Sequence, residues 1–531
     1  MLAGGEPDPS TATVAENREP EGRSSKRASS GDLSRRQIRG SGLLLLGRGL
    51  SGLKFIAELL VVRYLSTTEY GSWSYALSAV VLLRGAATLG LNRAVTRFVP
   101  IHLERGEHRE LFEVLGFVLG SLALATTGIV TAFYVFPAAV AAIAGVSDRQ
   151  PIDLLFVLIL LVPVEAIDDF LTGVCAAFTD SRTIFVRRYL LNPALRLGVA
   201  IALVVFQGPI EFLAYGYLFA GIAGIAYYTW SVYVALRRRG LIDRTLLRGW
   251  RLPAARVLSY TGGVMAADWC GIVMITSGPL LLGYFSDLSA VALFKVVVPL
   301  VTLNLVVAQT FVVMFEPTAS RLHARGDREG LTGFYWHSAL WVALLSFPAF
   351  AITFTAAEPL TVLLFGERYA SAAPILSILT VGAYFEAVIG FNLATLRVAG
   401  KLRWLLGTNI TATIVSIALH LLLIPRMGAL GAGIAAGASA IIYGVLKQVG
   451  MRISTGVGKF DLRYAGPYLS IAFACLFLLA VRLLWSERAV VLVSAATLAS
   501  LAVLLQARST LSISETFPEL GRFKVLKMLL G

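Results

Sequence analysis

Residues 98–111 read FVPIHLERGEHREL, and residues 315–331 read FEPTASRLHARGDREGL. Both stretches contain Phe-x-Pro, then Arg-Gly followed by an acidic residue, and then a Leu after the last charged residues. The two Arg-Gly pairs begin at Arg105 and Arg325, which are 220 positions apart. Such a match predicts that one charged loop occurs twice in the fold.

A second pair of matching stretches has the same offset. Residues 63–73 read RYLSTTEYGSW, and residues 283–294 read GYFSDLSAVALF, so that Tyr64 is matched by Tyr284. One matching loop can arise by chance, but two at one offset indicate an internal duplication.

The composition is typical of a membrane protein. The chain of 531 residues is 57% hydrophobic and 15% charged, and its mean hydropathy is +0.75. A soluble domain carries about 25% charged residues. Apolar stretches recur between residues 41 and 507, and each has the roughly 20 residues needed to cross a bilayer core of about 30 Å. We therefore expect an all-α polytopic membrane protein with about 14 helices, near 41–62, 70–92, 110–136, 152–176, 189–206, 212–236, 257–281, 288–315, 332–356, 371–396, 404–424, 428–446, 464–484 and 488–507.

The net charge of +14 follows from this topology. Most of the 46 Lys and Arg residues fall on the two tails and on the loops of one side. Six lie on the opposite loops: Arg63, Arg149, Arg368, Arg426, Arg482 and Arg488. The positive-inside rule then predicts a multi-pass protein of the cell membrane with both termini in the cytoplasm. The positive charge indicates attraction to anionic lipids, and we expect no nucleic-acid partner.

The matching loops define the expected domains. Six helices separate the copies, and this even number places both copies on the same side, as in a parallel repeat about an axis along the membrane normal. We expect six-helix lobes at 41–236 and 257–450, two further helices in 464–507, a disordered tail at 1–40 and a cytoplasmic tail at 508–531. The basic linker 237–256 is predicted to lie on the cytoplasmic leaflet as an amphipathic helix. The repeated loops are either solvated turns with helix-capping charges or a latch between the lobes.

Several motifs occur in an order that resembles a known family: YLSTTEYGSW (64–73), RFVPIHLERGEHREL (97–111), LLGYFSDLSAVALF (281–294), FEPTASRLHARGDREGL (315–331), LLFGERYASAAPIL (363–376) and LLLIPRMGALGAGIA (421–435). The set resembles the polysaccharide and lipid-linked oligosaccharide flippases, which belong to an exporter superfamily that also contains multidrug extruders and lipid II flippases. The resemblance covers about residues 41–450.

The resemblance implies a function and partners. It implies alternating-access transport of a polyprenyl-(pyro)phosphate-linked glycan from the cytoplasmic to the outer leaflet, without enzymatic chemistry or a cofactor. It also implies contact with membrane lipids, a groove for the lipid tail in 464–507, H⁺ or Na⁺ as a coupling ion, and other polysaccharide-assembly proteins as partners.

Five cations fall inside predicted helices: Arg48, Lys54, Arg84, Arg196 and Lys295. A charge at the bilayer centre costs about 2.5–3.5 kcal/mol on insertion scales, so each needs a structural or functional reason. We consider all five as phosphate ligands in a cavity between the lobes, with Arg84 first because it lies deepest.

Each cation also has a structural alternative. Arg84 can pair with an acidic neighbour. Lys54 can pair with Glu58, four positions later on one helix face. The other three, Arg48, Lys295 and above all Arg196, can extend their charged ends to the membrane interface. Arg187 and Arg188 are predicted to be interfacial.

Six acidic residues are candidates for ion coupling: Glu58, Glu165, Asp168, Asp169, Asp268 and Glu386. Positions 165, 168 and 169 share one helix face. A carboxylate in a wet cavity can carry a coupling proton or help to bind Na⁺. Alternatively, these acids neutralise embedded arginines.

The sequence contains no motif typical of a catalytic site or a metal site. The five histidines and three cysteines show no metal-ligand spacing, and no nucleophile triad or phosphate-binding Gly loop is present. A glycan polymerase or glycosyltransferase needs a sizeable outer loop, whereas the longest one predicted here covers only about residues 137–151. An ion-coupled drug antiporter of the same superfamily is the main alternative, although five embedded cations favour an anionic substrate.

Overall fold

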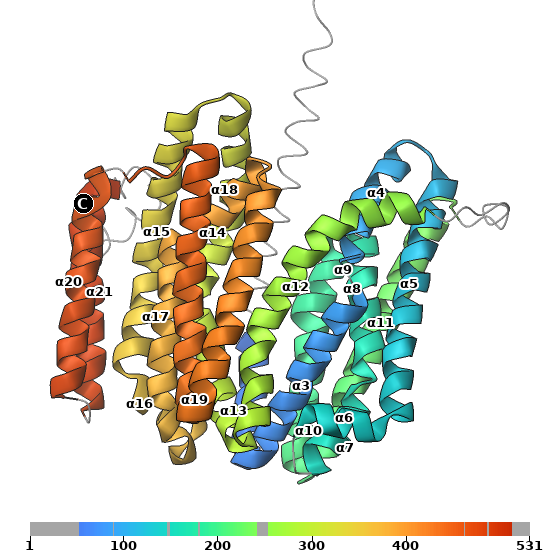
Figure 1. Cartoon of the computed structure of the whole chain (residues 1–531), viewed down its shortest axis with the longest axis horizontal. Coiled ribbons are helices and arrows are strands. Elements are labelled where there is room, and N and C mark those ends of the chain that lie inside the picture. Colours follow the sequence, from blue (N-terminus) through green and yellow to red (C-terminus); the bar gives the residue numbers. More distant parts are fainter. Residues whose placement is uncertain are drawn as a thin grey trace, which may run out of the picture.

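The computed structural model describes residues 52–88, 90–145, 149–178, 181–241, 253–460, 462–485 and 488–511. None of these residues forms a β-strand, and helices make up nearly all of them (Figure 1). The prediction of an all-α polytopic membrane protein is confirmed. Arg48, the tail 1–40, most of the tail 508–531 and the linker residues 242–252 lie outside the described residues.

The helices before the linker form the N-terminal bundle. They are α2 (Gly52–Tyr64), α3 (Thr67–Thr88), α4 (Asn92–Glu104), α5 (His108–Val135), α6 (Pro137–Ala144), α7 (Arg149–Leu158), α8 (Leu161–Phe178), α9 (Ser181–Phe185), the π-helix η1 (Val186–Leu191), α10 (Asn192–Val205) and α11 (Ile210–Arg238).

The helices after the linker form the C-terminal bundle and a peripheral pair. The bundle contains α12 (Ala254–Phe285), α13 (Leu288–Val296), α14 (Val298–Ala324), α15 (Arg328–Thr355), α16 (Ala357–Phe365), the 3-10 helix η3 (Glu367–Ala372), α17 (Ala373–Ile389), α18 (Asn392–Val398) and α19 (Leu402–Thr455). A 3-10 turn, η4 (Leu462–Tyr464), leads into α20 (Ala465–Leu484) and α21 (Ala489–Leu511), which lie together at the edge of the molecule (Figure 1).

Ten helices of the described part are long and apolar enough to cross a membrane, or eleven if the bent pair α3 and α4 counts as one span. The predicted number of 14 therefore stays a prediction. One reason for the difference is that the span expected at 152–176 is divided between α7 and α8.

The 54-residue α19 explains a further part of the difference, because it is a helical hairpin. Gly428 has φ 54° and ψ −130°, a non-helical conformation that separates two helical arms. The Tyr443 hydroxyl donates a hydrogen bond to Asn409 Oδ1 at 2.8 Å. In a straight helix these residues would be about 50 Å apart, so the arms fold back on each other.

The duplicated loops have the same backbone structure. Gly106 and Gly326 both adopt left-handed conformations, with φ of 70° and 71°, which glycine adopts without steric cost. Three backbone hydrogen bonds of the first turn recur 220 positions later: Arg105 N to Ile101 O, Gly106 N to Leu103 O and Glu107 N to His102 O, then Arg325 N to Arg321 O, Gly326 N to His323 O and Asp327 N to Leu322 O.

The helices that follow these turns also match. Both α5 and α15 contain 28 residues, and α15 begins and ends 220 positions after α5. The acidic residues of the two turns differ in role. Asp327 caps α15 by accepting a hydrogen bond from Gly330 N at 2.8 Å, whereas Glu107 lies 2.6 Å from His102 Nδ1. Both acidic residues contact groups of their own loop, and Asp327 has the helix-capping role that was expected.

The two bundles meet where α3 and α13 begin, at the bottom of Figure 1. Gly71 of α3 lies so close to Leu288 of α13 that a Cβ atom there would overlap the Leu288 carbonyl. Arg63 donates to the carbonyls of Leu364 at 2.7 Å and Leu363 at 2.5 Å. In return, Arg368 donates to the carbonyls of Val62 at 2.6 Å and Arg63 at 2.9 Å.

Candidate functional site

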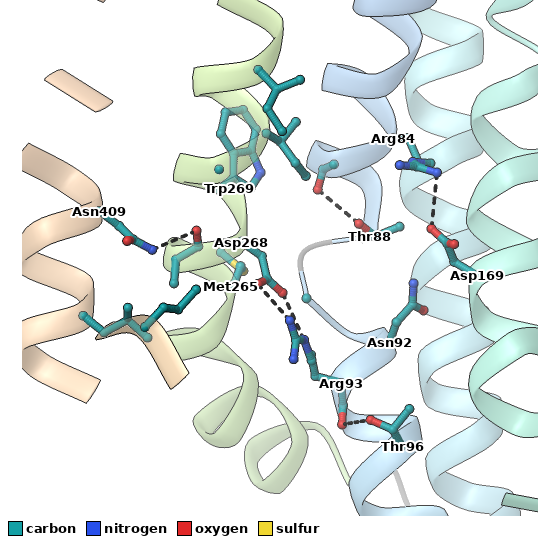
Figure 2. A pocket seen from close by; sticks show the side chains of 18 of the residues that line it. Arg84, Thr88, Asn92, Arg93, Thr96, Asp169, Met265, Asp268, Trp269 and Asn409 are labelled. Atoms are coloured by element: carbon teal, nitrogen blue, oxygen red, sulfur yellow. Dashed lines mark hydrogen bonds and ion pairs between the residues drawn. The ribbon is translucent and has the colours of Figure 1, made fainter. Parts of the chain in front are cut away.

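A cavity of about 790 Å³ lies between the two bundles, toward the ends of α3 and α18 and away from the contact between α3 and α13. Side chains of both bundles line it (Figure 2). Its charged lining residues are Arg84, Arg93, Arg188, Arg397, Asp169 and Asp268. Four cations thus face two carboxylates in what we call the central cavity.

The two walls of the central cavity differ. The wall from the N-terminal bundle carries Arg84, Arg93 and Arg188 but only one carboxylate, that of Asp169. The wall from the C-terminal bundle has one cation and one carboxylate, together with Trp269, Tyr443, Asn409 and several apolar side chains. Excess positive charge is therefore confined to one wall.

One ion pair crosses the central cavity. Arg93 of α4 reaches both carboxylate oxygens of Asp268 on α12, with Nε to Oδ2 at 3.2 Å and Nη2 to Oδ1 at 3.1 Å (Figure 2). The fork of a guanidinium fits a carboxylate in this two-point manner. The pair links the bundles on the side opposite the contact between α3 and α13.

A second cavity, of about 390 Å³, lies inside the N-terminal bundle among α2, α3, α8, η1, α10 and α11. We call it the N-bundle cavity. Its charged lining residues are Lys54, Arg84, Arg187, Arg188, Arg196, Glu165, Asp168 and Asp169. Arg84, Asp169, Thr172 and Arg188 line both cavities, so the two share a wall.

Arg84 combines both roles considered from the sequence. Its Nη1 lies 3.1 Å from Glu165 Oε2 and 3.5 Å from Asp169 Oδ2, and its side chain is 28% exposed. The residue is therefore paired with acidic neighbours and still lines both cavities.

Arg187 was predicted to be interfacial, and this prediction is wrong. Its side chain is only 4% exposed, and its Nη2 lies 2.7 Å from Asp168 Oδ1. Gly224 on α11 makes room for it, because a Cβ atom there would overlap the guanidinium. Arg187 belongs to η1. A π-helix has a wider turn than an α-helix, so its side chains point in other directions than an α-helix over the same residues would give.

Arg196 was expected mainly at the membrane interface but lines the N-bundle cavity instead. Its Nη2 lies 3.5 Å from Glu165 Oε1, and its guanidinium stacks on the Tyr217 ring at 4.6 Å. The acids on α8 thus neutralise embedded arginines.

Lys54 and Glu58 do not form the ion pair considered from the sequence. Within the described residues, no ion pair joins them; Lys54 lines the N-bundle cavity. Glu58 accepts a hydrogen bond from the Tyr70 hydroxyl at 3.1 Å and is within electrostatic range of Lys295 on α13. Lys295 is half-buried and lines neither of these two cavities.

Glu386 lies apart from the central cavity lining and pairs with Lys447, whose Nζ is 2.9 Å from Glu386 Oε1. The Lys447 side chain is only 3% exposed and lies 3.9 Å from the Tyr443 ring centroid. The sequence analysis did not single out Lys447, which comes one position after the expected span at 428–446.

Three other site residues were also missed. Arg93, Arg188 and Arg397 line the central cavity, but the sequence assigns each to the end of a span or to a loop. Arg93 could have been considered from the sequence, because Asp268 lies inside a predicted span and an acidic residue there is expected to have a cationic partner.

A model of the family described as "Polysaccharide biosynthesis protein" matches residues 38–323. The chain belongs to this family. The resemblance predicted from the sequence is thereby confirmed at the family level.

Several solved structures of transporters have a similar fold. The lipid II flippase MurJ in an inward-closed conformation has a TM-score of 0.67 and 14% identity, and the match covers 91% of this chain and 99% of that one. An inward-facing multidrug resistance MATE transporter of the MOP superfamily has a TM-score of 0.62 and 13% identity, and the match covers 76% of this chain and 94% of that one. The Vibrio cholerae MATE transporter VcmN in the bent form has a TM-score of 0.54 and 16% identity, and the match covers 81% of this chain and 100% of that one. No curated protein matches the chain. These similarities show that the chain has the fold of the MurJ flippase and the MATE transporters.

Proposed function

We propose that this protein is a flippase that moves a polyprenyl-(pyro)phosphate-linked oligosaccharide or polysaccharide precursor from the cytoplasmic to the outer leaflet. The observation that carries the proposal is the central cavity, where four arginines face two carboxylates. An arginine fork suits phosphate oxygens. Both carboxylates are engaged by Arg84 and Arg93, which leaves Arg188 and Arg397 as the principal phosphate ligands.

The glycan would face the other wall. Trp269, Tyr443 and Asn409 from the C-terminal bundle combine aromatic faces with amide and hydroxyl groups, which suit the apolar and polar faces of a sugar ring. A volume of about 790 Å³ lies within the range of about 300–1,000 Å³ common to ligand cavities.

Transport would proceed by alternating access, from a state that is closed on the outer side. With the topology predicted from charged loops, the contact between α3 and α13 closes the outer side, and the central cavity lies toward the cytoplasm. Transport would then separate the outer contact, including the reciprocal hydrogen bonds of Arg63 and Arg368.

The lipid tail would remain in the bilayer. A groove of about 590 Å³ between α20 and α21 is lined mostly by apolar side chains, among them Leu469, Phe473, Phe477 and Leu498. We assign the polyprenyl chain to this groove as part of the same proposal.

The driving force is most simply the membrane potential. Five of the six carboxylates nominated for ion coupling contact a cationic side chain, and the sixth, Glu58, accepts from Tyr70. A coupling proton or Na⁺ would compete with those contacts. An inside-negative potential favours outward movement of an anion by about 2.3 kcal/mol per charge per 100 mV.

Reconstitution tests the proposal. Purified protein in liposomes is given a fluorescent polyprenyl-pyrophosphate-linked glycan, and the label that becomes accessible on the far leaflet is measured. Wild-type protein should flip the lipid, and Arg188→Gln and Arg397→Gln should each slow flipping about tenfold or more. Arg426→Gln is the matched control, because Arg426 does not line the cavity. Equal rates in all four proteins would refute the assigned site.

A drug antiporter of the same superfamily is the second candidate, favoured by the similarity to MATE transporters. Such a protein would bind cationic compounds through Asp169, Asp268 and the aromatic residues of the cavity. Proton- or Na⁺-driven uptake of a cationic dye by the same liposomes, without movement of the lipid-linked glycan, would establish this function instead.

A further inference from the structure

The N-bundle cavity has a charge imbalance that its own side chains do not correct. Five cations and three carboxylates line it. Each carboxylate is already used: Glu165 by Arg84 and Arg196, Asp168 by Arg187, and Asp169 by Arg84. In the part of the chain that the structure describes, no carboxylate lies within ion-pairing distance of Lys54 or Arg188.

The remaining donors also lack acceptors. Arg187 Nη1 and Arg196 Nε are buried, and neither has a hydrogen-bond partner among the described residues. Lys54 lies within electrostatic range of Arg196, Arg188 and Arg187. Mutual repulsion and unmet hydrogen bonds inside a membrane-embedded bundle are costly, and a single anion among these groups would relieve both.

The arrangement is held in place by the backbone. Arg187 and Arg188 follow one another in the π-helix η1, a type of helix that often occurs at functional sites. Gly224 leaves space for the Arg187 guanidinium, and Asp168 fixes it from the other side at 2.7 Å. The Arg187 guanidinium is therefore positioned by packing.

We propose that the N-bundle cavity binds one small monovalent inorganic anion of the chloride class, held by Lys54, Arg188, Arg187 and Arg196. Two features favour a small, singly charged ion over a phosphate group. The three carboxylates in the same cavity repel a multiply charged anion, and the unpartnered donor atoms are buried, so a compact ion reaches them with the least rearrangement.

This anion is distinct from the transported lipid. Arg397, on the far wall of the central cavity, does not line the N-bundle cavity. Arg188 lines both, so an ion in the N-bundle cavity would reduce the positive charge that Arg188 presents to a substrate. Occupancy would thereby weaken phosphate binding at the central cavity.

Binding of radioactive chloride to the full-length protein in lipid nanodiscs tests the proposal, in sodium gluconate buffer without any lipid-linked glycan. Wild-type protein should bind chloride saturably. Lys54→Gln and Arg188→Gln should each weaken binding about tenfold or more. Lys54→Arg keeps the positive charge and should bind chloride as the wild type does, which excludes misfolding as the cause of the loss in Lys54→Gln. Arg397→Gln should also bind chloride as the wild type does.

Three outcomes would overturn the site: no saturable binding to wild-type protein, unchanged binding by Lys54→Gln, or a loss in Arg397→Gln as large as that in Lys54→Gln. The last result would place the anion in the central cavity. Because no lipid substrate is present, chloride binding and glycan flipping fail or succeed independently.

Discussion

The embedded acidic residues of α8 are paired with arginines, and part of this arrangement was predictable residue by residue. Positions 165, 168 and 169 were expected to share a helix face, and each of these acids contacts an arginine. The partner of Asp168 could not be predicted. Arg187 comes just before the expected span at 189–206, and its burial depends on the π-helix and on the space at Gly224.

Gly224→Ala should destabilise the N-terminal bundle. The new methyl group would displace the Arg187 guanidinium and weaken its pair with Asp168, at a cost of about 1–3 kcal/mol. Thermal unfolding of the purified protein measures the change. Gly198→Ala on α10 is the control, because a Cβ atom there meets no neighbour within 4 Å. Equal stability of the two variants would contradict the role assigned to Gly224.

At the scale of the helices, the sequence predicted which helices of the two bundles are equivalent better than it predicted where a helix is broken. The offset of 220 residues between the charged loops correctly placed α5 and α15 as equivalent helices. The breaks between α7 and α8 and at Gly428 were harder to place, since hydropathy averages over about 19 residues and does not respond to one non-helical position.

Gly71→Ala should weaken the contact between α3 and α13. The added methyl group would overlap the Leu288 carbonyl, which belongs to rigid backbone. We expect the outer side to open more often, and a shift of about 1 kcal/mol changes the populations about fivefold. The measurement is labelling of Thr88→Cys, in a background without the three natural cysteines, by an impermeant maleimide added outside.

The control for this experiment is Gly120→Ala on α5, where a Cβ atom meets nothing within 4 Å. It should leave labelling at the level of the parent protein. Labelling that is equally low in Gly71→Ala would show that the contact between α3 and α13 does not close the outer side.

At the scale of the whole molecule, the sequence predicted two bundles but not their relative placement. Both states of an alternating-access transporter use the same helices with the same hydropathy, so composition does not tell which side is closed. The cavity wall was predicted in part: Arg84, Asp169 and Asp268 line it, whereas Lys54 and Arg196 line the N-bundle cavity instead.

The ion pair between Arg93 and Asp268 should control the separation of the bundles on the predicted cytoplasmic side. Asp268→Arg would place two cations together, and spin labels at Arg105→Cys and Arg325→Cys should report a longer mean distance. Adding Arg93→Asp restores an opposite-charge pair and should return the distance toward that of the parent. If the single and double variants gave the same distances, the pair would have no such role.

The central claim, that the cavity between the bundles admits an anionic lipid headgroup, is tested most directly with two fluorescent glycolipids of identical glycan and polyprenyl chain. One carries the pyrophosphate, and in the other a neutral linker replaces it. In the same proteoliposomes, our account predicts flipping of the pyrophosphate lipid and at most slow flipping of the neutral lipid. Equal rates for the two lipids would contradict it.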